Sequence, residues 1–125
     1  MINIPKLKKI ALIGATTNKS KFGYKILKDL VKKGYEVLPV TPNYDEIEGI
    51  KTYKSVSELP EVDILNFVVP PKIGLEVTKE AYKNGFKKFW YQPGAESQEI
   101  KEFLDSLNDP EVDYIFYKCI MVETM

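Results

Sequence analysis

The sequence predicts an α/β fold: a Rossmann-like, doubly wound and mostly parallel sheet with helices on both faces. Short apolar runs alternate with segments whose apolar residues recur at helical spacing. Several of these runs are continuously apolar, which is typical of strands covered on both faces. With 125 residues the chain has room for one sheet and its flanking helices, so we expect a single domain over residues 1–125.

The first unit is a strand at 10–13, a polar turn and a helix. Apolar residues at 22, 26, 27, 30 and 31 share one face of that helix, lysines occupy the other face, and Gly34 ends it. We expect Asn18 or Ser20 as its N-cap. Residues 35–40 form the second strand, which completes a parallel crossover unit of about thirty residues.

The middle of the chain is less regular. Residues 44–49 predict a loop and 50–53 a short edge strand, while Ser55 and Glu58 have capping-box spacing for one helical turn. The remaining elements are a central strand at 62–69, a helix from the following prolines to about Asn84, a strand at 87–91, a helix at 97–107 and a last strand at 112–117. The apolar edge at 112–117 favours a homodimer.

Composition excludes several functions. Eighteen basic and 18 acidic side chains give no net charge, so we expect neither nucleic acid nor membrane as a partner. Without a signal-peptide core or an apolar stretch of membrane length, we expect a cytoplasmic protein. The absence of histidine removes the commonest metal ligand and general base, and we expect no metal and no catalytic residue. Cys119, the single cysteine, fits a reducing compartment.

A phosphate-binding turn is predicted where the first strand meets the first helix. Gly14 relieves the turn of a Cβ clash, and the free amides and dipole of the helix N-terminus suit an anion, most naturally the phosphates of a nucleotide-like cofactor. Ligands of such sheets bind at the carboxyl ends of the strands. The four loops there, at 14–23, 39–42, 69–71 and 92–95, are rich in glycine or proline and offer fixed shape instead of acid and base groups.

Better-known nucleotide motifs are missing. The dinucleotide fingerprint G-x-G-x-x-G fails because the next glycine after Gly14 is Gly23, and Thr41 and Pro42 stand where an acidic residue would hold a ribose. The spacing G-x-x-x-x-G-K-[ST] is also absent, and the first strand ends without a carboxylate that a response regulator would phosphorylate.

Five segments, in order, resemble the small stand-alone CoA-binding proteins, whose fold is similar to the CoA-binding domain of the succinyl-CoA synthetase α subunit. The segments are 14–16 with 21–23, then 38–42, 67–71, 90–95 and 119–123. Many relatives have Val-Asn-Pro and then a basic residue where this chain has Val40-Thr41-Pro42 and Asn43. Lys118 stands where many have arginine.

The resemblance implies coenzyme A, or an acyl-CoA, as the cofactor. The pyrophosphate would rest on the amides of 14–17, helped by Lys19 or Lys21, the adenosine would lie between 40–42 and 69–71, and the pantetheine arm would pass toward Gln92 and Gly94. The cofactor-binding residues expected are Gly14, Ala15, Thr16, Thr17, Lys19, Lys21, Phe22, Gly23, Pro39, Val40, Thr41, Pro42, Val69, Pro70, Pro71, Gln92 and Gly94.

Three functions stay open at this point. The first is a CoA or acyl-CoA binding module without turnover, since the synthetase needs a phosphorylated histidine on a further domain and this chain has no histidine. The second is a redox-linked protein in which Cys119 forms a mixed disulfide with the CoA thiol. The third is an NAD(P)-binding reductase that uses Tyr91 or Tyr117 as an acid.

Overall fold

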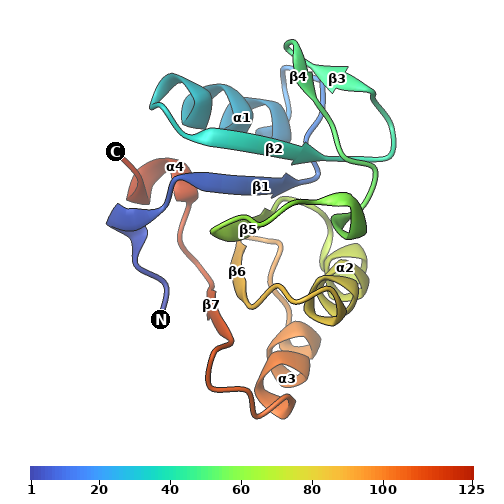
Figure 1. The fold of residues 1–125 in the computed structure, drawn as a ribbon, viewed down its shortest axis with the longest axis vertical. Helices are drawn as coiled ribbons and strands as arrows, with labels where there is room; N and C mark the ends of the chain where they lie inside the picture. Colours follow the sequence, from blue (N-terminus) through green and yellow to red (C-terminus); the bar gives the residue numbers. More distant parts are fainter.

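A five-stranded parallel sheet with helices on both faces forms the body of the molecule, as a computed structural model of residues 1–125 shows (Figure 1). The strand order is β2-β1-β5-β6-β7. The strands of this sheet are β1 (Lys9–Ile13), β2 (Glu36–Val40), β5 (Ile64–Phe67), β6 (Lys88–Tyr91) and β7 (Asp113–Ile115). The helices are α1 (Phe22–Lys32), α2 (Pro71–Lys83), α3 (Gln98–Ser106) and α4 (Ile120–Glu123), with single 3₁₀ turns η1 (Ile4–Lys6) and η2 (Val56–Glu58). The predicted fold class is confirmed.

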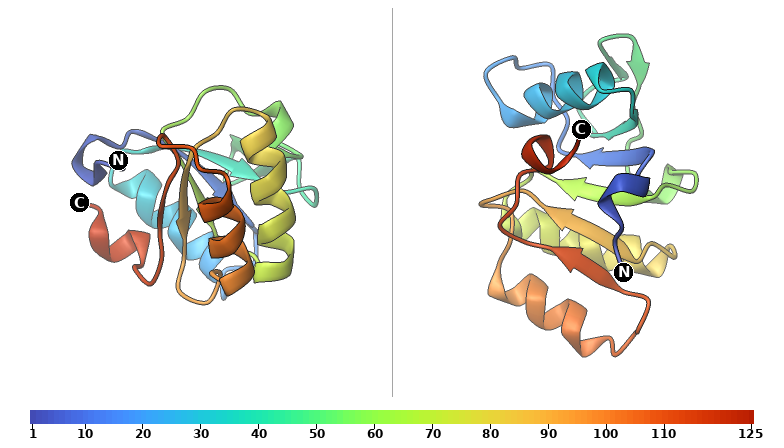
Figure 2. Two further views of the ribbon diagram at one scale, coloured as in Figure 1. Left: turned by 90° about the horizontal axis from the view of Figure 1, so that it is seen from below. Right: turned by 90° about the vertical axis from the view of Figure 1, so that its left-hand side faces the viewer.

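Alternating side chains of the sheet build two separate cores. Ile10, Leu12 and Trp90 face the layer of α1 and α4, where they pack with residues such as Leu27. Ala11, Phe67 and Tyr91 face the layer of α2 and α3. Both faces are therefore covered, which explains why the strands read as continuous apolar runs. Figure 2 shows α1 and α4 on one side of the sheet and α2 and α3 on the other.

The strand order reverses between β1 and β5. From β1 the chain passes through α1 to β2 on one side, and later strands are added on the other side, beyond β5. In open parallel sheets the crevice at such a reversal, at the carboxyl ends of the strands, is where ligands bind.

None of the helices combines enough length with enough apolar character to span a lipid bilayer.

The segment at 44–53 differs from its prediction. The predicted loop contains β3 (Glu46–Ile47), which pairs antiparallel with β4 (Ile50–Lys51) across Glu48 and Gly49. Both turn residues have positive φ, 53° and 79°, as two-residue hairpin turns often require. The predicted edge strand at 50–53 is correspondingly divided: 50–51 belongs to the hairpin, and Tyr53 forms a single parallel bridge to Val40 of β2.

The N-cap predicted for α1 was wrong, whereas the helical turn predicted at 55–58 is present as η2 without the capping-box hydrogen bonds. Lys21, with no side-chain cap bond, is the N-cap of α1. The Asn18 side chain instead accepts hydrogen bonds from the backbone and hydroxyl of Ser20, at 3.0 and 2.7 Å, and forms a turn before the helix. Ser55 is the N-cap of η2, but its side chain makes no cap bond, and Glu58 accepts from the amide of Lys54.

The last strand is shorter than predicted. β7 spans only Asp113–Ile115, and Tyr117 takes a positive φ of 67°, which is incompatible with a continued strand. The long apolar edge expected at 112–117 is therefore absent, and it no longer supports the homodimer, which stays a prediction. The chain continues through Cys119 into α4, which packs against α1.

Candidate functional site

Two cavities open at the carboxyl ends of the strands, and both are bordered by Val69. The first, of about 400 Å³, lies beside the ends of β1 and β2, and we call it the β2-side cavity. The second, of about 510 Å³, lies beside the end of β6, and we call it the β6-side cavity. Together they follow the edge at which the strand order reverses.

The β2-side cavity is a slot between two apolar walls. Val40, Thr41 and Pro42 form one wall, where β2 ends and proline fixes the backbone. Ile73 and Val77 of α2 form the other, and Ile73 keeps 53% of its surface exposed although it is a large apolar residue. The lining of this cavity is therefore largely apolar.

The turn after β1 separates the two cavities and depends on two glycines. Gly14 has φ +102°, its amide donates to the Val40 carbonyl, and a Cβ there would lie 2.8 Å from Cγ1 of Val69. A Cβ on Gly23 would lie 2.3 Å from the Gly14 carbonyl oxygen. The first turn of α1 therefore packs directly on the turn, in the way that the last glycine of a dinucleotide fingerprint lets a helix approach a strand.

Two backbone amides of this turn are free of partners within the chain. Those of Ala15 and Thr16 donate to no protein acceptor, although Ala15 is buried, whereas the Thr17 amide is directed toward the Tyr44 hydroxyl. The next amide, that of Asn18, donates a hydrogen bond to the hydroxyl oxygen of Thr16 at 3.1 Å. With the uncapped N-terminus of α1 packed alongside, the turn presents donors and a positive helix end, which is an arrangement that binds anions.

Tyr44 closes the far side of this turn. Its hydroxyl lies 3.3 Å from the hydroxyl oxygen of Thr16, and hydrogen bonds from Thr16 and then Thr17 hold the pKa of Tyr44 below its ordinary value. Tyr44 also borders the β2-side cavity. The slot and the anion-binding turn are therefore contiguous.

The β6-side cavity ends at a buried polar network around Gln92. Its amide nitrogen donates to Sγ of Cys119 at 3.2 Å, and its oxygen accepts from the Ile120 amide at 2.8 Å and from Asn66 at 3.1 Å. Lys21 and Phe22 border the same cavity. A thiol, a buried amide and a cation thus line one cavity.

Most of the predicted site residues line a cavity. Those on the β2-side cavity are Gly14, Ala15, Thr16, Val40, Thr41, Pro42 and Val69. Those on the β6-side cavity are Lys21, Phe22, Val69, Pro70, Gln92, Gly94 and Cys119. The amide of Gly94 donates to the Glu96 carboxylate, so Gly94 offers shape and no free donor.

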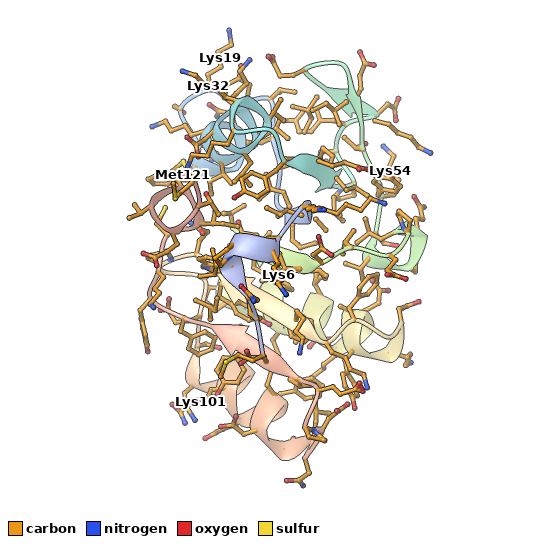
Figure 3. All side chains as sticks on the ribbon, turned by 60° about the vertical axis from the view of Figure 1, so that its left-hand side comes forward. Lys6, Lys19, Lys32, Lys54, Lys101 and Met121 are labelled. Atoms are coloured by element: carbon orange, nitrogen blue, oxygen red, sulfur yellow. The ribbon has the colours of Figure 1, made fainter.

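Five predicted residues line neither cavity. Pro39 lies within β2 and Pro71 starts α2, while Gly23 is used for packing. Thr17 contacts the Tyr44 hydroxyl, and Lys19 extends away from the body of the molecule in Figure 3.

Sequence reasoning missed the α2 wall and the segment after the hairpin. Ile73, Val77 and Glu80 recur at i, i+4 and i+7, a spacing that could have indicated a shared helix face turned toward the strand ends. Lys54, Ser55 and Val56 also border the slot, and no local signal marks them, because only the bridge of Tyr53 to Val40 carries them there.

The two tyrosines considered as acids of a reductase do not border the cavities. Tyr91 is fully buried and hydrogen-bonded to Thr78 at 2.6 Å, and its burial raises its pKa far above the ordinary value. Tyr117 is 76% exposed. The geometry gives the reductase hypothesis no support.

A parallel sheet with an amide-rich glycine turn between two cavities defines a nucleotide-binding α/β domain. The chain belongs to the CoA binding domain family, whose model matches residues 8–125. The resemblance inferred from the sequence is confirmed.

Relatives of two kinds share this domain. The acetate–CoA ligase (ADP-forming) of Methanocaldococcus jannaschii is 41% identical over 81 residues, which are 64% of this chain but only 12% of the ligase. A conserved hypothetical protein of Pyrococcus furiosus has a solved structure with a TM-score of 0.90 and 63% identity, covering 94% of this chain and 99% of that one. The uncharacterized protein YneT of Bacillus subtilis is 28% identical over 102 residues, 81% of this chain and 76% of that protein. The chain thus spans a small fraction of the curated ligase.

Proposed function

We propose that the chain binds coenzyme A across both cavities as a binding module without turnover. The observation that carries this proposal is the contiguity of an apolar slot, a turn with free amides and a second cavity that ends at a thiol. Coenzyme A has the matching three parts: an aromatic base, a diphosphate and a flexible arm with a terminal thiol.

Each part of the ligand has a counterpart in the chain. The adenine ring packs between Pro42 and Ile73, and the diphosphate accepts hydrogen bonds from the amides of 15–16. The pantetheine arm crosses Val69 and runs along Gln92. Lys21, on the β6-side cavity, supplies a charge near the crossing.

A role without turnover follows from what lines the cavities. Most contacts come from apolar side chains and backbone groups, and no hydrogen-bonded pair of titratable side chains borders either cavity. General acid–base chemistry requires such a positioned group within hydrogen-bond reach of the reacting atom. We therefore infer that the chain holds and presents the thiol instead of transforming it.

Calorimetry with a charge placed in the slot tests the proposal. We expect saturable binding of CoA, little binding of NAD, and an affinity for CoA reduced at least about tenfold in Ile73→Glu, because a carboxylate against an aromatic base must lose its hydration. Val122→Glu is the matched control, since Val122 is an exposed valine on α4 that borders neither cavity. Clear binding of NAD without binding of CoA would overturn the proposal.

A second candidate function is a mixed disulfide between Cys119 and the CoA thiol. The observation that favours it is that Cys119 borders the same cavity as the predicted pantetheine path, with its sulfur 3.2 Å from the Gln92 amide nitrogen. In the balanced step, the Cys119 thiolate attacks the disulfide of oxidised CoA, a protein–CoA disulfide forms, and one CoA thiolate leaves. The oxidant is the CoA disulfide itself.

Intact mass spectrometry distinguishes this role from simple binding. After incubation with oxidised CoA we expect an adduct of one CoA on the wild type and none on Cys119→Ala. An unmodified wild type that still binds reduced CoA by calorimetry would remove the redox role and leave the binding module in place.

A further inference from the structure

We propose that Lys54 binds the 3′-phosphate of the CoA adenosine and so selects CoA over ligands that lack this phosphate. This inference rests on the proposed function, because it assumes that adenosine occupies the β2-side cavity. It concerns the segment 54–56, for which no part in ligand binding was predicted from the sequence.

The fold holds Lys54 at the rim of the slot through its backbone. Tyr53 is attached to the end of β2 by two hydrogen bonds: its amide donates to Pro39 at 2.8 Å, and its carbonyl accepts from Thr41 at 2.9 Å. The amide of Lys54 itself donates to Glu58 at 3.1 Å. Lys54 therefore starts beside the Thr41–Pro42 wall from a fixed position, and Figure 3 shows it between the hairpin and the turn that follows.

Charge makes Lys54 distinct within this cavity. It is the only cationic residue among those that border the slot, and Glu80 is the only anionic one. The two do not pair with each other, since the Lys54 ammonium contacts Asp45 at 2.9 Å and the Tyr44 carbonyl at 3.0 Å. An apolar slot with one cation at its rim suits a base attached to a phosphate.

The present partner of Lys54 is weak enough to be replaced. The side chain of Asp45 is 96% exposed, and exposed ion pairs contribute only about 0–1 kcal/mol. A phosphate monoester carries a charge of about −1.5 to −2 near neutral pH and three acceptor oxygens, so it attracts an ammonium more strongly than a single hydrated carboxylate does. The ammonium can turn from Asp45 toward a phosphate without losing a buried contact.

Tyr44 sets the distance between Lys54 and the diphosphate turn. Its carbonyl accepts a hydrogen bond from the Lys54 ammonium, and its hydroxyl lies 3.3 Å from the Thr16 hydroxyl in the turn. Tyr44 therefore connects Lys54 with the anion-binding turn. The geometry thus provides one donor group for each phosphate position of the CoA nucleotide.

Titration of CoA and 3′-dephospho-CoA tests the assignment. We expect the wild type to prefer CoA by about tenfold or more, which corresponds to about 1.4 kcal/mol, and this preference should decline as salt is added. Lys54→Met should reduce the affinity for CoA to that for dephospho-CoA without changing the latter. Lys51→Met is the matched control, because Lys51 lies on β4 with its ammonium 5.3 Å from the Tyr53 ring and does not border the slot.

Asp45→Asn supplies an independent variant that keeps Lys54 intact. Freed from its carboxylate, Lys54 should bind CoA more tightly, with dephospho-CoA unaffected. Equal affinities of the wild type for both ligands, or an equal loss of both in Lys54→Met, would overturn the assignment while CoA binding stands. If the wild type binds neither ligand, the proposed function itself fails.

Discussion

Replacing Gly23 with alanine would place a Cβ 2.3 Å from the carbonyl oxygen of Gly14, at the point where α1 packs on the anion-binding turn. Ordinary contacts of a Cβ begin at 3.4 Å, so the helix and the turn must separate by about 1 Å. The Gly14 oxygen belongs to the backbone and the new Cβ would be attached directly to the backbone, so neither can move away as the end of a flexible side chain would. The clash must therefore be relieved by displacement of whole elements.

The expected cost follows from two opposing effects. Overpacking of this kind costs about 1–3 kcal/mol, whereas exchanging glycine for alanine in a helix returns at most about 1 kcal/mol. We expect a net loss of about 1–2 kcal/mol in the free energy of unfolding. Because the turn carries the amides of 15–16, the affinity for CoA should also fall, by about tenfold or more.

Gly74→Ala is the matched control for this substitution. Gly74 is also helical, in α2, but the nearest atoms to its Cβ position lie at 3.6 Å or more, so alanine fits there. We expect this variant to be neutral or stabilised by up to about 1 kcal/mol. Urea unfolding followed by the fluorescence of the buried Trp90 measures both. A Gly23→Ala protein as stable as the Gly74→Ala protein, with unchanged CoA affinity, would refute the packing argument.

Three further predictions concern the network and the ends of the sheet. Gln92→Leu leaves the Ile120 amide and Asn66 without their acceptor and should lower the free energy of unfolding by about 2–4 kcal/mol. The control is Gln98→Leu, because the Gln98 amide lies at the surface, 3.4 Å from the Glu102 carboxylate. This variant should stay within about 0.5 kcal/mol of the wild type in the same unfolding assay. Lys33→Met removes the ammonium that binds the carbonyls of Met121 and Thr124. It should lower the free energy of unfolding by about 1–2 kcal/mol and speed hydrogen exchange at 120–124. Unaltered exchange there would count against the anchoring role of Lys33. The Glu111 amide, Lys87 and Tyr82 lower the pKa of Asp109 to about 2, so its contribution to stability is complete above its ordinary pKa of 3.8 and is lost as the pH falls through about 2. Unfolding measured from pH 5 to pH 2 should therefore depend less steeply on pH in Asp109→Asn, and identical slopes would contradict this assignment.

The repetitive part of the fold could be predicted because its signals are local. Strands β1 and β5 and helix α1 follow from apolar runs and helical spacing, and Gly34 ends α1 with φ +96°, as its position suggested. The hairpin at 46–51 was missed because each of its strands has two residues, too few for any periodicity. The N-cap of α1 was missed because Asn18 uses its side chain in a preceding turn.

The position of the candidate site at the strand ends could be predicted, but not all of the residues that border it. Gly14 and the prolines after β2 and β5 mark the strand ends, and topology brings parallel strand ends together. Ile73 and Lys54 reach the slot through the packing of α2 and through the Tyr53 bridge, which are contacts between distant segments. The packing role of Gly23 could not be predicted from its spacing, because the distance from Gly14 in the sequence does not match the dinucleotide fingerprint. The longer loop of this chain nevertheless places Gly23 against Gly14, where only a glycine fits.

Val69 is the one side chain that borders both cavities, and each of its methyl groups lies against a glycine. A Cβ on Gly14 would lie 2.8 Å from Cγ1, and a Cβ on Gly74 would lie 3.6 Å from Cγ2. A change of its χ1 rotamer would therefore alter the shape of both cavities at once. Fragments that fill the two cavities separately should consequently bind with free energies that do not add.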